Sequence, residues 1–327
     1  MHFTHLIFFN PILWDLVQKL VNSGVKLRPW LLVDKDHGYW ANVGNAAYIE
    51  EQAMQLSNLW TNTYGLQPTT FIIDMEPSWQ DSATLNQLKA KGNFIAVIKF
   101  LRSKMNLEKY DRAKSIYMKL IEKLHAAHWK VDVTTIPLLL DGHRNISEAF
   151  GCVIDGLPWD KITFQVYRTA YQSDPTLQKF GHLNSYLIYM YAKEALKRYG
   201  SIAGIDLGAT YPVNQGYNSE TFRDDVSAAL AAGISPKNIN LYSLAGIYGQ
   251  LNATWTYNRN ATQLWFISPQ PVRPSFNLPA LIARAGDKVL DIGLLFKNRL
   301  KYFRANEVNF VLPKSVFYSS AGNNKTS

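Results

Sequence analysis

The sequence predicts an α/β fold of the (β/α)8 TIM-barrel type, incomplete at its N-terminus. Along the first 262 residues, short β-branched or aromatic runs alternate with amphipathic stretches, the pattern of repeated βα units. Seven such runs can be recognised, and eight strands would close a barrel. A doubly wound open sheet is the main rival. Its first strand would run into a glycine-rich loop, whereas Asn10-Pro11 follows here.

The expected strands are His5–Phe9, Leu27–Val33, Thr70–Met75, Val131–Ile136, Ile162–Tyr167, Ile202–Leu207 and Ile239–Leu244. We expect the missing strand to be the first one, which implies a start that is truncated or misassigned. Apolar residues at helical spacing predict helices between the strands. Glycines in positions that end these helices follow at Gly24, Gly65, Gly200 and Gly233.

Two regions are expected, a barrel domain over residues 1–262 and a C-terminal extension over 263–327. Four prolines between Pro269 and Pro279 indicate an irregular connection. One amphipathic helix follows, with Val289, Ile292, Leu295 and Phe296 as its apolar face. Packing on the barrel is the favoured interpretation for this helix. Contact with a partner or with a membrane surface is the alternative.

Composition excludes several classes of protein. The chain has 327 residues, 47% of them hydrophobic, and a net charge of +9. No run of basic residues and no zinc or RNA-binding motif accompanies that charge, so no nucleic-acid partner is predicted. We interpret the charge, much of it between residues 284 and 304, as solubility charge. A single cysteine, Cys152, rules out a disulfide framework and a cysteine-based zinc site.

Targeting and cofactor signals are missing as well. The start lacks the pattern of a signal peptide, and no apolar stretch is long enough to span a membrane. Localisation therefore stays open, with secretion expected if the N-terminus is truncated. No cofactor and no metal is predicted. Asp34, Asp36 and His37 contain metal-binding groups, but a polar loop is the favoured interpretation. The oligomeric state is not predicted.

Asp74 and Glu76 form the central candidate site. They lie one β-period apart at the end of a buried strand, so both side chains point to the same face. In a parallel barrel, chemistry gathers at this edge. Adjacent carboxylates repel, which favours one protonated group acting as a general acid. The alternative is a pair of solvated acids or an ion pair with Arg168. Substrate-binding candidates at strand ends are Asp34, Tyr39, Trp40, Gln165, Arg168, Asp206, Tyr211 and Tyr242.

At these residues the chain resembles glycoside hydrolase family 18, the chitinase-like barrels. That family ends its fourth strand with D-x-x-D-x-D-x-E, and Asp74-Met75-Glu76 matches the last D-x-E. The sixth family strand ends in M-x-Y-D, and Gln165-Val166-Tyr167-Arg168 takes its place. The motif's first two aspartates are replaced by Thr69 and Ile72, its later acid by Arg168, and a late tryptophan by Tyr242. Family 25 lysozyme-like barrels also carry a strand-end D-x-E.

The resemblance implies roles for three residues. Glu76 would protonate the glycosidic oxygen, Asp74 would orient a 2-acetamido group, and Tyr167 would donate a hydrogen bond to its carbonyl. Such substrate-assisted cleavage needs no second carboxylate nucleophile. The leading hypothesis is therefore hydrolysis of a glycan that contains N-acetylhexosamine. A catalytically inactive, lectin-like barrel that binds glycan is the alternative.

Overall fold

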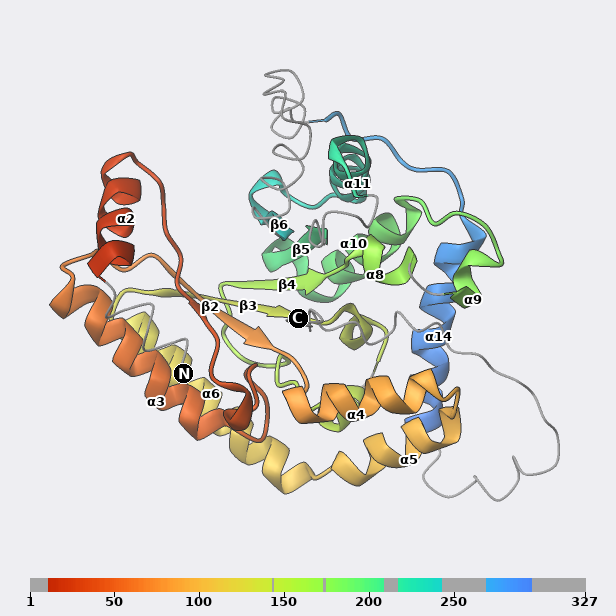
Figure 1. Cartoon of the computed structure of the whole chain (residues 1–327), viewed down its shortest axis with the longest axis horizontal. Helices are drawn as coiled ribbons and strands as arrows, with labels where there is room; N and C mark the ends of the chain where they lie inside the picture. Colours follow the sequence, from red (N-terminus) through yellow and green to blue (C-terminus); the bar gives the residue numbers. More distant parts are fainter. Residues whose placement is uncertain (1–10, 143, 173–174, 209–216, 243–268, 296–327) are drawn as a thin grey trace. The chain divides into compact units, whose positions relative to one another are not determined.

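The computed structural model describes residues 11–142, 144–172, 175–208, 217–242 and 269–295. Its strands are β1 (Trp30–Leu31), β2 (Thr70–Met75), β3 (Lys130–Thr135), β4 (Lys161–Gln165), β5 (Ala203–Gly208) and β6 (Ile239–Tyr242). They form one six-stranded sheet in sequence order (Figure 1). The pairs β1–β2, β2–β3 and β5–β6 are parallel. The predicted α/β fold with repeated βα units is confirmed, while the described residues do not establish a closed barrel of eight strands.

Helices occupy most of the sequence between the strands. The α-helices are α2 (Pro11–Asn22), α3 (Ala46–Asn58), α4 (Trp79–Ala90), α5 (Phe94–Lys104), α6 (Leu107–Ala126), α7 (Arg144–Phe150), α8 (Arg168–Gln172), α9 (Pro175–Gln178), α10 (Tyr186–Tyr199), α11 (Ser219–Ala232) and α14 (Leu278–Leu295). Shorter helical segments are η1 (Lys35–His37), η2 (Leu59–Thr63), η3 (Pro137–Leu140), η4 (Gly200–Ile202) and η6 (Pro236–Asn238).

Six of the seven predicted strands can be compared with the structure, because His5–Phe9 lies outside the described residues. The prediction for Leu27–Val33 was too long, since β1 has only two residues. Pro29 has no N–H to donate to a neighbouring strand. At the other end the chain turns back, and the Val33 N–H donates to the carbonyl of Tyr39 at 3.0 Å. Each end of the other five strands lies within two residues of the predicted end.

The described residues divide into two compact units. Unit 1 comprises residues within Met1–Leu85, Phe100–Thr135 and Ser147–Ile162. Unit 2 comprises residues within Asn86–Lys99, Ile136–Ile146 and Thr163–Ser327. The domain boundary predicted at residue 262 lies outside the described residues and stays a prediction.

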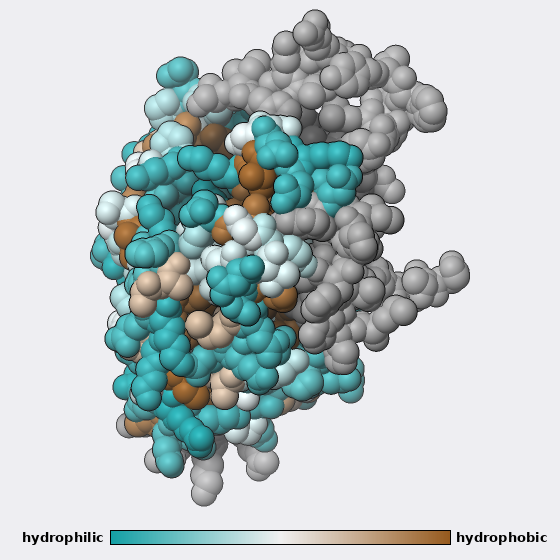
Figure 2. Space-filling view, turned by 90° about the vertical axis from the view of Figure 1, so that its left-hand side faces the viewer, coloured by the Kyte–Doolittle hydropathy of each residue, from teal (hydrophilic) through white to brown (hydrophobic). Residues whose placement is uncertain are grey.

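In unit 1, alternate residues of β2 pack in an aromatic core. Phe71 is fully buried, and its ring lies 5.7 Å from that of Trp129, which in turn lies 5.8 Å from Trp60. Two of the helices predicted between the strands are α3, which buries Ile49 and Leu56, and α6, which buries Tyr117 and Leu120. Hydrophilic side chains predominate on the described part of the face that carries α2 and α3 (Figure 2). With Phe71 facing the helices, the β-period directs Asp74 to the opposite side of the sheet.

In unit 2, α14 confirms the predicted tail helix but not its predicted buried face. Pro279 belongs to the first turn of this helix and not to the irregular connection, a position where proline is favoured. Ile292, expected to be buried, is 50% exposed. The buried residues of the helix are Pro279, Ala280, Ala283, Gly286, Asp287, Leu290, Asp291 and Leu294.

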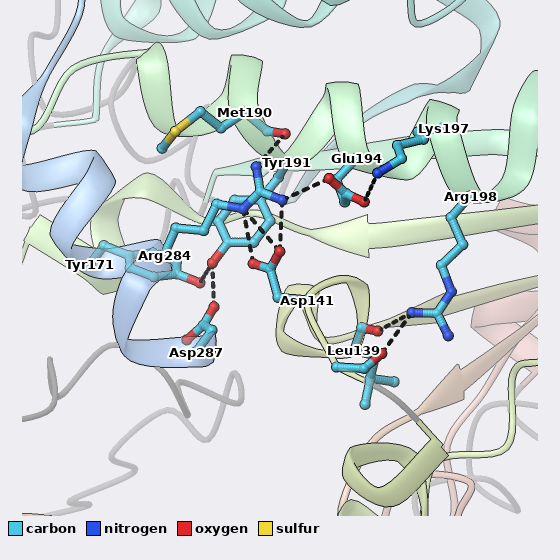
Figure 3. Close-up of polar contacts among 11 residues, drawn as sticks. Leu139, Asp141, Tyr171, Met190, Tyr191, Glu194, Lys197, Arg198, Arg284 and Asp287 are labelled. Atoms are coloured by element: carbon cyan, nitrogen blue, oxygen red, sulfur yellow. Dashed lines mark hydrogen bonds and ion pairs between the residues drawn. The ribbon is translucent and has the colours of Figure 1, made fainter. Parts of the chain in front are cut away.

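Arg284 corrects a second prediction, because its charge is used inside the fold and not for solubility, whereas Lys288 is exposed. Residues 297–304, which carry the rest of that charge, lie outside the described residues. Arg284 donates to both carboxylate oxygens of Asp141, at 2.6–3.0 Å, and to Glu194 at 3.0 Å (Figure 3). Asp287 is fully buried and accepts a very short hydrogen bond from the hydroxyl of Tyr191. These contacts attach α14 to α10 and to the end of η3. None of the described helices is long and apolar enough to cross a membrane.

Candidate active site

The carboxyl end of β2 holds both central acids in a buried position. Asp74 is 1% exposed and Glu76 is 0% exposed. Ala41 pairs with this strand end: its N–H donates to the Asp74 carbonyl at 2.8 Å, and its carbonyl accepts from the Glu76 N–H at 3.1 Å. On the other side, Thr135 Oγ1 of β3 donates to the Met75 carbonyl at 2.6 Å. The backbone that carries the two carboxyl groups is therefore fixed from both sides.

Three aromatic rings in unit 1 form a wall next to this strand end. The Tyr39 ring lies 4.9 Å from Trp40 and 5.8 Å from Trp79, and the two indoles lie 5.7 Å apart. Trp79 opens α4 directly after the β2 end, and its N–H donates to the carbonyl of Gly38 at 2.9 Å. Trp40 is buried, whereas Tyr39 and Trp79 are half-buried. Lys35 places its ammonium group 3.9 Å from the Trp79 ring centroid.

Tyr39 has a strained backbone. Its φ of 65° lies in the left-handed region, which costs a residue other than glycine roughly 1–2 kcal/mol. Two hydrogen bonds hold this conformation, from the Tyr39 N–H to the Asp34 carbonyl and from the Val33 N–H to the Tyr39 carbonyl. Strain of this kind clusters at functional sites. Here it turns an aromatic ring toward two acids.

The electrostatics show that Asp74 and Glu76 act on the same neighbours. Burial, then the charge of Asp74, then that of Glu76 raise the pKa of the Tyr39 phenol. The pKa of the Cys152 thiol is also raised by burial and by both acids, against an opposing hydrogen bond with Thr135. Tyr39 is therefore a neutral hydroxyl at physiological pH, able to donate a hydrogen bond. Cys152 is a buried thiol rather than a nucleophilic thiolate.

Asp34 lies in the loop that precedes the wall. Its carboxylate accepts from the His37 N–H at 3.0 Å and caps η1. Both carboxylate oxygens lie 2.8 Å from His37 Nδ1, and the imidazole stacks on Tyr48 at 4.1 Å. These contacts order the loop, and substrate binding by Asp34 stays a prediction. Among the described residues, no group of three or more His, Cys, Asp or Glu side chains could hold a metal ion.

The remaining candidates lie in unit 2, apart from Tyr211, which lies outside the described residues. Tyr167 and Tyr242 stack with ring centroids 5.6 Å apart. Asp206 accepts a hydrogen bond from the side-chain amide of Asn240 at 2.7 Å. Gln165 is buried at the end of β4. The structure thus brings together Tyr167 and Tyr242 within this unit, and their contact with substrate stays a prediction.

Arg168 makes an internal ion pair. Its Nε lies 3.4 Å from Asp225 Oδ1, and both side chains are at most 5% exposed. Its Nη2 also donates to the carbonyl of Thr221 at 3.2 Å. Burial raises the pKa of Asp225 to about 7, against the charge of Arg168 and a hydrogen bond from Tyr217. These contacts give Arg168 a structural role in unit 2, and its predicted role in substrate binding is untested.

Sequence reasoning missed Trp79 and the surroundings of Cys152. Trp79 stands only three residues after Glu76, which is a usable signal, because the start of a helix after a barrel strand lies at the functional edge. Cys152 has no such signal. Its position beside the β2 end depends on contacts with Thr135, which is distant in the sequence.

No protein-family model and no curated protein matches this chain. Among solved structures it is similar to the PgaB (BpsB) glycoside hydrolase domain from Bordetella bronchiseptica, with 14% identity and a TM-score of 0.44. The similarity covers 80% of this chain and 79% of that chain. At this level the likeness carries no argument, so the function is argued from the site.

Proposed function

We propose that this protein is a glycoside hydrolase that cleaves a glycan containing N-acetylhexosamine, with Glu76 as the general acid. The carrying observation is the pair of buried carboxyl groups at the β2 end, beside a wall of aromatic rings. Flat rings of this kind pack against the C–H faces of sugars. Two carboxyl groups in one low-dielectric region do not ionise equally, so one can keep a proton for the leaving group.

In this proposal each residue has a distinct task. Glu76 protonates the glycosidic oxygen, and Asp74 remains ionised and orients the acetamido group, as the resemblance to family 18 implies. Tyr39 supplies a neutral hydroxyl next to both acids. Trp79 provides a half-buried ring for a sugar unit, since Trp40 is buried already. Tyr167, in unit 2, keeps as a prediction the role that the resemblance implies, and Tyr167→Phe tests it by the loss of kcat.

The central test is Glu76→Gln, measured on chitin oligomers and on peptidoglycan. Loss of a general acid should lower kcat by about 100- to 10,000-fold, with little change in oligosaccharide affinity. Asp36→Asn is the matched control, because Asp36 is an exposed acid on the same loop region as the wall. Its activity should equal that of the wild type. Equal activity of Glu76→Gln and the wild type would remove Glu76 from the mechanism.

Trp79→Ala separates binding from chemistry. Loss of one stacking ring should raise KM by roughly 3- to 10-fold, with a smaller effect on kcat.

The lectin-like alternative is favoured by the replaced motif positions Ile72 and Arg168. Wild-type protein that binds oligosaccharide in calorimetry, loses this binding in Trp79→Ala, and releases no product on prolonged incubation would establish that alternative and overturn hydrolysis.

A further inference from the structure

An ordinary surface helix turns polar residues to the outside, whereas the outer face of α14 is apolar. Leu278, Leu281, Ala285, Lys288 and Ile292 are all exposed. At 3.6 residues per turn they fall within an arc of about 80°. The helix therefore presents an apolar stripe to the outside, interrupted by a single lysine, while it buries charged residues on the inside.

The inward charges prevent the helix from rotating to hide this stripe. Arg284 is engaged by Asp141 and Glu194, and Asp287 by the hydroxyl of Tyr191 (Figure 3). Breaking a buried, hydrogen-bonded ion pair is strongly unfavourable. The exposure of Leu281 and Ile292, 44% and 50%, is thus fixed by the polar contacts on the other side of the helix.

A further apolar side chain is exposed next to the N-terminal end of α14. Phe276, two residues before the helix, is 64% exposed. The Phe276 ring lies 5.7 Å from Tyr186 of α10. Exposed apolar groups that adjoin one another in this way mark an interaction surface.

The exposed charged residues of α14 and of the segments 175–193 and 269–277 are basic. Arg273, Lys288, Lys179 and Lys193 are exposed. The sequence has no acidic residue between Pro175 and Lys193, and none between Thr262 and Gly286. The two acids of α14, Asp287 and Asp291, are buried. The sequence that follows the helix adds Lys297, Arg299, Lys301 and Arg304 before its next acid, Glu307.

We propose that the outer face of α14, with Phe276 beside it, is a peripheral binding surface for an anionic lipid bilayer. Apolar side chains enter the headgroup boundary, and basic side chains contact the anionic headgroups, each contributing to affinity. A bilayer fits better than a folded protein partner, because the exposed charged residues of α14 and of the segments 175–193 and 269–277 are all basic. The surface is independent of the proposed hydrolase site.

The test is flotation of the full chain with phosphatidylcholine vesicles, with and without about 30% phosphatidylglycerol. The wild type should bind the anionic vesicles selectively, and binding should weaken as salt rises from about 0.1 to 0.5 M. Leu281→Glu with Ile292→Glu should lower the partition coefficient at least about thirtyfold. Lys288→Glu should lower it about five- to thirtyfold.

Leu107→Glu is the matched control, because Leu107 is 51% exposed and lies on α6 in unit 1. This variant should bind like the wild type, and circular dichroism should show all variants folded. Wild-type protein that ignores anionic vesicles overturns the proposal. So does a self-association in solution that the same double variant abolishes, or binding of a DNA duplex that depends on Lys288 but not on Leu281 and Ile292.

Discussion

The buried acids at the end of β2 and those around α14 differ in what surrounds them. Around α14, Asp141 and Glu194 share the guanidinium of Arg284, and Asp287 is hydrogen-bonded to Tyr191. At the β2 end, the charges of two acids act on a phenol and a thiol and raise the pKa of both. Burial of a carboxyl group is therefore not by itself a sign of function. A matched cation indicates a structural role, and neighbouring acids next to aromatic rings favour chemistry.

The largest expected effect comes from removing the cation of the α14 cluster. Arg284→Ala leaves Asp141, whose side chain is 1% exposed, without its bidentate partner. Loss of one partner of a buried ion pair destabilises by about 3–5 kcal/mol, measured as the free energy of unfolding in urea. Lys288→Ala, an exposed change on the same helix, should stay within about 0.5 kcal/mol of the wild type. A similarly small effect of Arg284→Ala would show that the cluster does not stabilise the fold.

This cluster also shows where prediction from sequence ended. The helix itself was predictable from its 3.6-residue period, but its buried face was not. Arg284 and Asp141 are 143 residues apart, and Tyr191 and Asp287 are 96 apart. An apolar period assigns leucine and isoleucine to the interior, and only these distant partners make the polar face the buried one. Tertiary contacts therefore overrode the amphipathic pattern.

For β2, in contrast, the sequence predicted both the strand and the direction of its side chains. The run Thr70–Met75 was predicted to the residue, because β-branched and aromatic residues between a polar stretch and Pro77 define a strand locally. Asp74 and Glu76 followed from the same alternation. The aromatic wall was predictable only in part, since Tyr39 and Trp40 precede a recognisable helix while Trp79 depends on its contact with Gly38. The functional roles themselves stay predictions.

A second prediction concerns Asp225, a buried acid of unit 2 beside Arg168 and Tyr217. Its pKa, about 7, lies above its ordinary value because of burial, so the folded state holds the proton more tightly than the unfolded chain. This contribution to stability is complete below about pH 4 and is lost as the pH rises toward 7. The loss is on the order of 4 kcal/mol.

The measurement compares the wild type with Asp225→Asn. Urea unfolding at pH 5 and at pH 8 should give a larger drop in unfolding free energy for the wild type than for the variant, because the amide does not titrate. The double difference isolates Asp225 from other titrating groups. If the two proteins show the same pH dependence, Arg168 keeps the Asp225 carboxyl ionised across the range. Asp225 and Arg168 would then be a structural ion pair that takes up no proton.

The smallest expected effect separates the two regions most directly, because the same substitution is made in each. Glu194 lies in the α14 cluster, where burial raises its pKa but the hydrogen bond and charge of Arg284 outweigh this and lower it overall. Glu194→Gln loses a charge-assisted hydrogen bond from Arg284. This loss should lower the free energy of unfolding by about 1 kcal/mol. The effect is small because Glu194 is partly exposed.

Glu76→Gln should act in the opposite direction. The amide keeps the volume of the side chain and removes the cost of keeping a second carboxyl protonated beside Asp74, so the free energy of unfolding should be unchanged or rise by up to about 1 kcal/mol. Urea unfolding at pH 7 measures both variants. If Glu76→Gln destabilises as much as Glu194→Gln does, then Glu76 stabilises the fold in the same way, and the distinction between the two regions fails. Opposite signs would mean that the β2 end carries an acid pair at the expense of stability, as residues retained for chemistry do.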